Sequence, residues 1–154
     1  MSGEAAVFEE LDRRVRLHVY SRLLDTGGAP TAAETAEALS RPVADVERAY
    51  RRLSEGRALV LAPGTLNVWM ANPLSAVPTP FRVRVGERAH WGNCIWDALG
   101  IIAMLGGDGE VSTRCADCQA PMALAVRDGS LLPAESVIHF AVPAAHWWDN
   151  IGFN

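Results

Sequence analysis

The segment WGNCIWDALGIIAML, residues 91–105, contains the longest apolar run of the 154-residue chain, interrupted by Asp97. Two glycines follow it at positions 106 and 107, and glycine at this place commonly ends a helix. We therefore expect a buried helix from Cys94 to about Leu105. The run is too short to cross a hydrocarbon layer, which takes about 20 apolar residues, so it predicts no membrane span.

The segments around this helix have the alternation and the turn residues of short strands. FRVRV at 81–85 alternates apolar residues with arginine, as a half-buried strand does. EVSTRC at 110–115 and MALAVRD at 122–128 predict two paired strands, and VIHFAVP at 137–143 predicts a further one. The second half of the chain is thus expected to be a small α+β unit, a mixed sheet with one buried helix.

The first half of the chain predicts three helices and a hairpin. Residues 6–24 have helical apolar spacing up to a glycine pair, and Thr31 with Glu34 has the spacing of a capping box that starts a second helix. A third amphipathic pattern, residues 40–56, begins with a cap-like Ser-Arg-Pro and ends on glycine. Two apolar runs around a Pro-Gly turn, residues 58–71, predict a hairpin.

These elements predict an α+β fold in two domains. Three helices followed by a hairpin are typical of the winged-helix variant of the helix-turn-helix. We assign this winged-helix-like module to about residues 5–72, within a first domain of residues 1–75. Prolines at positions 73, 78 and 80 predict a linker. The second domain, residues 76–154, then holds the small mixed sheet and the buried helix.

The overall composition excludes several classes of protein. A hydrophobic content of 49% with 21% charged residues is unlike that of disordered chains. The net charge of −4 gives no general attraction to nucleic acid or to anionic lipid. The N-terminus is acidic where a secretory signal is basic, and three cysteines are an odd number that argues against a disulfide framework. We expect a cytoplasmic protein with reduced thiols and without a membrane or nucleic-acid partner.

Cys94 and Asp97 are the candidate reactive groups. With Asn93 as the N-cap, Cys94 falls in the first helical turn, where free N–H groups and the helix dipole favour a thiolate. Asp97 follows three residues later on the same face, and apolar neighbours should raise its pKa so that it carries a proton. A thiolate beside a proton-donating carboxyl suits cleavage of a carbon–metal bond, because sulfur binds a soft metal and the acid protonates the carbon. The spacing alone favours a plainer interpretation, a buried structural cysteine and an aspartate bonded to nearby backbone.

Three segments together resemble the alkylmercury (organomercurial) lyase family. WGNCIWDALGIIAMLG, residues 91–106, is similar to the family's catalytic segment, in which an aromatic residue precedes Cys-x-x-Asp-x-Leu on a buried helix. EVSTRCADCQAPMAL, residues 110–124, resembles its strand-turn-strand, where Cys115 matches a cysteine usually regarded as structural. VIHFAVPAAHWWDNIGFN, residues 137–154, resembles the approach to its last catalytic element. With the N-terminal module and the proline linker, the resemblance covers nearly all of the chain.

The resemblance implies an enzyme that cleaves the carbon–mercury bond of an organomercurial by protonolysis, giving a hydrocarbon and Hg(II). Cys94 is then the mercury ligand and Asp97 the proton donor that shares the metal site. No organic cofactor is implied, since mercury is substrate and product, and small thiols are the expected acceptors of Hg(II). The family also uses a second catalytic cysteine near the position of Phe153 and Asn154. None of the three cysteines in this sequence matches it.

Cys115 and Cys118 form a Cys-x-x-Cys pair, the spacing of a zinc half-site or of a redox dithiol. No second pair completes a tetrahedral zinc site, so a structural turn is favoured over metal binding. A further hypothesis is that Cys118 supplies the missing catalytic thiol, if the turn folds over Cys94.

Aromatic and histidine side chains near Cys94 complete the expected site. His90 lies four residues before Cys94, and a structural, hydrogen-bonded histidine is favoured over one that tunes the thiol. Four tryptophans are expected to line or close an apolar pocket that suits an alkyl or aryl group. They are Trp91, Trp96, Trp147 and Trp148.

A second class of function remains open, a non-enzymatic soft-metal-binding protein or a metal-responsive transcriptional regulator that captures metal with its cysteines. Its DNA-reading element would be the third predicted helix, where Arg48, Arg51 and Arg52 lie at positions able to contact phosphate. Acidic residues share this helix, so a solvated face is favoured and nucleic-acid binding is not expected.

Overall fold

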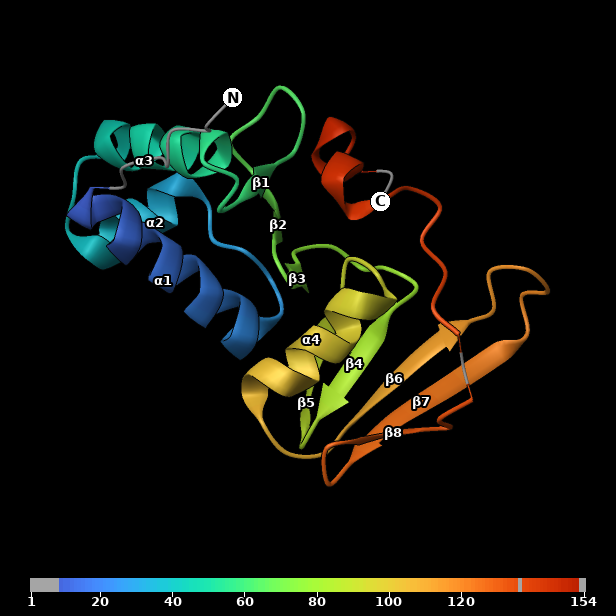
Figure 1. Cartoon of the computed structure of the whole chain (residues 1–154). Helices are drawn as coiled ribbons and strands as arrows, with labels where there is room; N and C mark the ends of the chain where they lie inside the picture. Colours follow the sequence, from blue (N-terminus) through green and yellow to red (C-terminus); the bar gives the residue numbers. More distant parts are fainter. Residues whose placement is uncertain (1–8, 136, 153–154) are drawn as a thin grey trace.

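The computed structural model describes residues 9–135 and 137–152. The predicted start of the first helix, residues 6–8, lies outside this range. Three helices come first in the chain and pack together at one end of the molecule (Figure 1). They are α1 (Glu10–Thr26), α2 (Ala32–Leu39) and α3 (Val43–Glu55).

The ends of these helices follow from local sequence. Gly27 ends α1 with a φ of 75°, a left-handed conformation that glycine adopts without strain. The predicted capping box is confirmed, because Thr31 Oγ1 accepts the Glu34 N–H at 3.2 Å and the Glu34 carboxylate accepts the Thr31 N–H at 2.7 Å. Ser40 ends α2 with a φ of 51° instead of starting α3, whose N-cap is Pro42.

A small antiparallel sheet follows, in the order β1-β2-β3. The predicted hairpin is confirmed by the pairing of β1 (Val60–Leu61) with β2 (Val68–Ala71). A third strand, β3 (Leu74–Ser75), lies in the segment expected to be a linker. Leu74 also bridges Gly92, so this sheet joins the two halves of the chain.

The second half contains a five-stranded sheet in the order β5-β4-β6-β7-β8. The strands are β4 (Arg82–Val85), β5 (Arg88–Trp91), β6 (Gly109–Arg114), β7 (Pro121–Arg127) and β8 (Ser130–Leu132). The predicted pairing of β6 with β7 is confirmed, whereas β5 and β8 were not predicted. The α+β class is confirmed, but the sheet that we expected to be mixed has antiparallel pairing between all its neighbouring strands.

Helix α4 (Ile95–Leu105) packs on β4 and β6 of this sheet (Figure 1). The buried side chains of this layer are Val83, Val111 and Leu124 from the sheet and Ala98, Ile101 and Ile102 from the helix. The opposite face of α4 is exposed at Trp96 and Met104, so the predicted buried helix is buried along one side. This packing fixes where the helix begins and therefore where its first residues lie.

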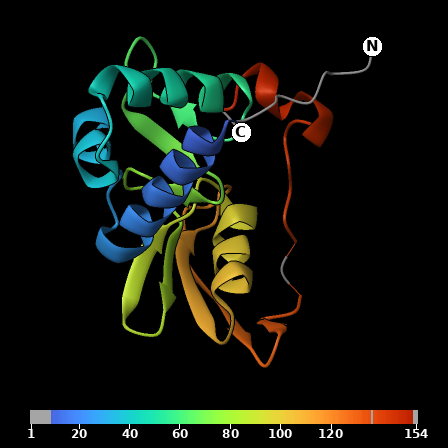
Figure 2. The same cartoon turned by 90° about the vertical axis from the view of Figure 1, so that its left-hand side faces the viewer.

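The C-terminal segment crosses from the large sheet back toward the first three helices. Figure 2 shows it running beside α4 to the 3₁₀ helix η1 (Ala144–Asp149). The predicted strand at 137–143 is wrong, because these residues pair with no strand of the described structure. Phe140 instead packs against Trp96 and Trp147, which are side-chain contacts that a strand pattern does not reveal.

Candidate active site

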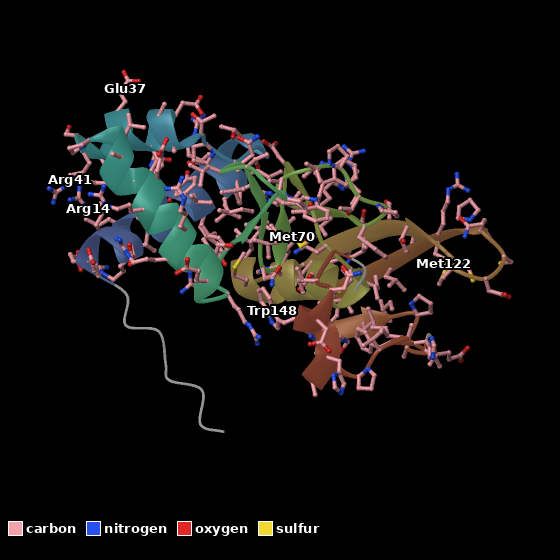
Figure 3. The ribbon with its side chains drawn as sticks, turned by 90° about the horizontal axis from the view of Figure 1, so that it is seen from above. Arg14, Glu37, Arg41, Met70, Met122 and Trp148 are labelled. Carbon is pink, nitrogen blue, oxygen red and sulfur yellow. The ribbon has the colours of Figure 1, made fainter. Side chains whose placement is uncertain are left out.

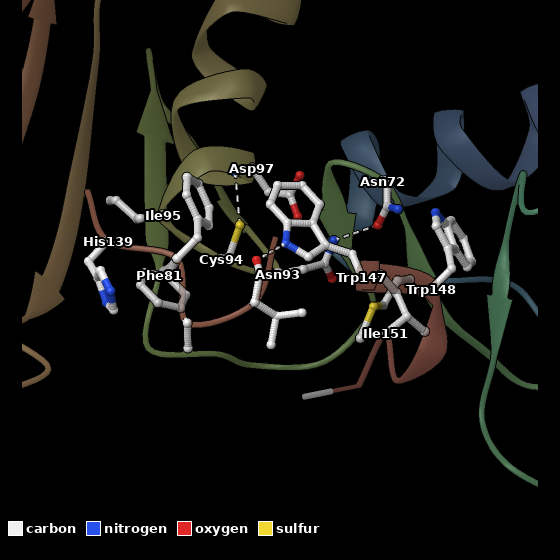
Figure 4. A pocket seen from close by; sticks show the side chains of 14 residues that line it. Asn72, Phe81, Asn93, Cys94, Ile95, Asp97, His139, Trp147, Trp148 and Ile151 are labelled. Carbon is white, nitrogen blue, oxygen red and sulfur yellow. Dashed lines mark hydrogen bonds between the residues drawn. The ribbon is translucent and has the colours of Figure 1, made fainter. Parts of the chain in front are cut away.

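A cavity of about 280 Å³ lies between the start of α4 and the C-terminal segment (Figure 4). The start of α4 contributes Asn93, Cys94, Ile95 and Asp97. The C-terminal segment contributes chiefly apolar side chains, Phe140, Val142, Trp147, Trp148 and Ile151. The cavity therefore has a small polar cluster on one side and, on the other, an apolar surface that we call the aromatic wall.

Cys94 occupies the N-cap of α4, with an extended backbone (φ −142°, ψ −178°). Its sulfur accepts the backbone N–H of Asp97 at 3.4 Å. The expectation that Asn93 caps the helix and that Cys94 lies in its first turn is therefore wrong by one position. The sulfur lies at the open end of the helix, where unpaired backbone N–H groups are concentrated.

The pKa of the Cys94 thiol is raised, so the predicted preference for a thiolate is wrong in direction. Burial is the largest cause, because the charged sulfur would lose its hydration. The backbone N–H of Asp97 opposes this shift, while the charge of the Asp97 carboxylate adds to it. In the free protein Cys94 thus favours the thiol form.

The pKa of Asp97 is raised by burial, as its apolar surroundings predict. Hydrogen bonds from the side chains of Asn93 and Cys94 oppose part of this shift because they stabilise the carboxylate. Figure 4 shows Cys94 and Asp97 side by side at the start of α4. The structure therefore brings the two predicted residues together, and the carboxyl next to the sulfur has a raised pKa.

Asn93 connects this pair to the first half of the chain. Its Nδ2 donates to the Asn72 side-chain oxygen at 3.0 Å and to the Pro73 carbonyl at 3.3 Å. Asn72 itself lines the cavity. The sequence signals did not identify Asn72, because it stands 21 residues from Asn93 and belongs to no motif with it.

The aromatic wall is built on the C-terminal segment. Phe140 packs on Trp147 with ring centroids 5.1 Å apart and edge-on to Trp96 at 6.4 Å. The Trp147 Nε1–H donates to the Val142 carbonyl at 2.8 Å, which orients the indole. Of the four predicted tryptophans, Trp147 and Trp148 line the cavity.

The other two tryptophans do not line the cavity. Trp96 is 58% exposed on the outer face of α4, on the far side of Phe140. Trp91 ends β5 and pairs with Arg82. The expectation for these two residues is wrong because proximity to Cys94 in sequence does not decide on which side of the helix or strand a ring lies.

Comparisons with known proteins bear on this geometry. The family model described as MerB: Alkylmercury lyase matches residues 74–153, more than half of the 154-residue chain. The chain belongs to the alkylmercury lyase family. The matched range contains Cys94, Asp97, the whole large sheet and the aromatic wall.

One solved structure adds information on the fold. It is the mercury-bound form of MerB2, which matches with a TM-score of 0.63 and 21% identity over 82% of this chain. The chain spans 60% of the length of that protein. This likeness supports the same α+β fold. The comparison with curated proteins found no match.

The alkylmercury lyase resemblance predicted a second catalytic cysteine, and Cys118 was one candidate. Cys115 and Cys118 lie on the turn between β6 and β7, and neither lines the cavity. The hypothesis that Cys118 folds over Cys94 is therefore wrong. Among the described residues that line the cavity, Cys94 is the only cysteine.

His90 does not line the cavity. It is 3% exposed on β5, opposite Val83, and burial lowers its pKa. Neither ring nitrogen has a hydrogen-bond partner among the described residues, so the expected hydrogen bond is not found. His139, from the C-terminal segment, lines the pocket instead.

The arginines of α3 are engaged with acidic side chains. Each of the three forms an ion pair: Arg48 with Asp45, Arg51 with Glu47, and Arg52 with Asp12. These pairs neutralise the charge that phosphate contacts would require.

Within the described residues, no helix has the length and apolar character needed to cross a membrane.

Proposed function

We propose that this chain cleaves the carbon–mercury bond of organomercurials by protonolysis, with Cys94 as mercury ligand and Asp97 as proton donor. The observation that carries the proposal is the meeting of the Cys94 sulfur and the Asp97 carboxyl in one cavity with an apolar wall. Burial raises the pKa of both groups, which favours their protonated forms, and both lie next to the apolar wall.

The first step is a thiol exchange at mercury. An organomercurial enters as its complex with a small thiol, R–Hg–SR′. The Cys94 sulfur displaces R′S⁻ and its own proton passes to that leaving thiolate, so R′SH departs and R–Hg–S–Cys94 remains. Soft sulfur is the ligand that this metal prefers.

The second step is transfer of the Asp97 proton to the carbon bound to mercury. The carbon–mercury bond breaks, its electron pair takes the proton, and R–H leaves. Cys94–S–Hg⁺ then faces the Asp97 carboxylate, which balances the charge of the metal. A carboxyl with an ordinary pKa would be ionised near neutral pH and would have no proton to give.

The third step restores the resting state. Two molecules of small thiol give Hg(SR′)₂, and their two protons return to Cys94 and Asp97. No electron transfer and no organic cofactor enter this sequence. The substrate's organic group lies against Ile95, Phe140 and Trp147, so small alkyl and aryl groups suit the cavity of about 280 Å³.

We further propose that residues 1–75 are a winged-helix-like module that braces the catalytic half instead of reading DNA. Three contacts between this module and the rest of the chain support this role. The Asn93 Nδ2 donates to the Asn72 side-chain oxygen at 3.0 Å, and Arg88 pairs with Asp25 at 3.1 Å. Arg57 lies 5.3 Å from the centre of the Trp148 ring, on the aromatic wall itself.

The test of lyase activity is release of hydrocarbon from an organomercurial. Purified chain is incubated with phenylmercuric acetate or methylmercury chloride and excess glutathione, and benzene or methane is measured by gas chromatography. We expect release from the unaltered chain and none from Cys94→Ser above the rate without protein. Absence of hydrocarbon from folded, unaltered chain would reject the proposal.

A further inference from the structure

The turn between β6 and β7 carries two free thiols away from the cavity. Cys115 directly follows β6, and Cys118 is exposed in the turn. Figure 3 shows Met122, next to this turn, at the opposite end of the molecule from Arg41. Neither sulfur is used by the proposed cleavage reaction.

Hydrogen bonds fix the shape of this turn. The Cys115 N–H donates to the Ala120 carbonyl and the Gln119 N–H donates to the Cys115 carbonyl, both at 2.9 Å. The Arg114 guanidinium donates to the Gln119 carbonyl at 3.0 Å, and the Gln119 side chain donates to the Ala116 carbonyl at 3.3 Å. Little conformational freedom is therefore left for a bound ligand to remove.

The surroundings of Cys115 in this turn lower the pKa of its thiol. The largest causes are the backbone N–H groups of Cys118 and Asp117, and the Cys118 side chain acts in the same direction. Backbone N–H groups directed at sulfur stabilise a thiolate. The hydrogen-bonded turn thus carries two free thiols three residues apart, and the pKa of the first is lowered.

We propose that Cys115 and Cys118 form a second metal site, a two-sulfur chelate for a soft cation, separate from the catalytic cavity. The described residues contain no group of three or more histidine, cysteine or acidic side chains able to share one ion. Zinc, which takes four ligands, is therefore poorly served. A soft cation satisfied by two thiolates fits the donor set.

The cation that we assign to this site is Hg(II), an assignment that rests on the proposed function, whereas the two-sulfur geometry does not. On binding, two sulfur–mercury bonds form, the two thiol protons go to solvent, and no group is oxidised or reduced. This surface site would hold the Hg(II) that is released from the cavity. Because two linked sulfurs act as a chelate, it should outcompete a single small thiol by about 10²- to 10⁴-fold.

The test measures retention of Hg(II) by the reduced, full chain during dialysis against excess glutathione. A Cys94→Ser background removes the cavity's thiol, so that any remaining Hg(II) reports on the turn. In this background we expect one Hg(II) per chain. Adding Cys118→Ser should weaken retention by about a hundredfold, and Cys115→Ser should do the same. Asp117→Asn in the same background is the matched control and should retain the ion.

A second measurement does not depend on variants. Alkylation of the unaltered chain followed by mass spectrometry should show Cys115 and Cys118 protected together by one equivalent of Hg(II). Unchanged retention in the Cys94→Ser, Cys118→Ser double variant, no protection of the pair, or equal retention of Zn(II) would overturn the proposal. Hydrocarbon release is measured separately, so failure of the lyase reaction leaves the binding result interpretable.

Discussion

Buried polar groups are paired with charged or hydrogen-bonding partners in the helical region, whereas in the cavity they lack a cationic partner among the described residues. In the helical region Asp12 is fully buried, and Arg52 donates to both of its carboxylate oxygens, at 3.0 and 2.7 Å. Buried Tyr50 is likewise paired, with Thr35 at 2.9 Å and the Pro30 carbonyl at 3.0 Å. In the cavity, burial raises the pKa of Cys94 and Asp97 without a cationic partner that would reverse the shift.

This difference separates a region built for stability from one built for chemistry. A buried carboxylate paired with arginine links two helices together. A buried carboxyl without such a pair holds its proton to a higher pH than an exposed one and is better suited to donate it. The same residue type, aspartate, therefore has a structural role in α1 and a proposed catalytic role in α4.

The strongest test of this difference is Asp97→Asn. It keeps the shape of the side chain and removes the acidic proton, so hydrocarbon release should fall by about 10²- to 10⁴-fold. Because the buried acid is replaced by a neutral group, stability near neutral pH should not fall. Gas chromatography and chemical denaturation measure the two effects. Asp128→Asn, on an exposed turn, is the control, and activity of Asp97→Asn equal to that control would remove Asp97 from the reaction.

Arg52→Ala should show the opposite behaviour. It leaves the buried Asp12 carboxylate unpaired, and we expect the free energy of unfolding to fall by about 3–5 kcal/mol. The specific activity of the folded fraction should change little, because Arg52 does not line the cavity. Urea denaturation gives the stability. Arg48→Ala, which breaks an exposed pair with Asp45, should change it by about 0–1 kcal/mol.

Gly92→Ala tests how closely the start of α4 is packed. A Cβ at Gly92 would lie 2.7 Å from the Ala98 backbone nitrogen and 2.8 Å from its Cα, so the helix must shift. We expect destabilisation of about 1–3 kcal/mol together with reduced hydrocarbon release, since Cys94 and Asp97 move with the helix. Thermal unfolding and the release assay measure both.

Gly100→Ala is the matched control within α4. The nearest atom to its added Cβ is Pro73 Cβ at 3.7 Å, an ordinary contact. Alanine is favoured over glycine inside a helix by about 0.5–1 kcal/mol, so this variant should be as stable as the unaltered chain or slightly more so. Equal destabilisation by both substitutions would show that packing at Gly92 is not special.

The dependence on pH should be the smallest effect and should follow the raised pKa of Asp97. Its folded pKa lies above the ordinary 3.8, so the stability that the neutral carboxyl provides is complete below 3.8 and is lost as pH rises through the folded pKa. The unaltered chain should therefore lose stability relative to Asp97→Asn over this range, and hydrocarbon release should decline with it. Denaturation at a series of pH values checks the first trend, and a parallel pair of curves would contradict it.

Local sequence determined much of the fold. The capping box of Thr31 and Glu34, the glycine that ends α1 and the apolar run of α4 each act within a few residues, because helical hydrogen bonds join neighbours in the chain. The pairing of β6 with β7 follows in the same way from a short turn. Even the direction of the Asp97 pKa shift was predictable, since its helix face is apolar.

Only the tertiary structure decided how the site is assembled. Local pattern placed Cys94 one position too far into the helix and predicted a thiolate, whereas burial in the folded chain raises the pKa of its thiol. Residues 137–143, predicted as a strand, instead contribute Phe140 and Val142 to the wall of the cavity. Asn72, which also lines the cavity, stands 21 residues before Asn93. Burial and contacts between distant segments depend on how all elements pack together, and no periodicity within one segment encodes them.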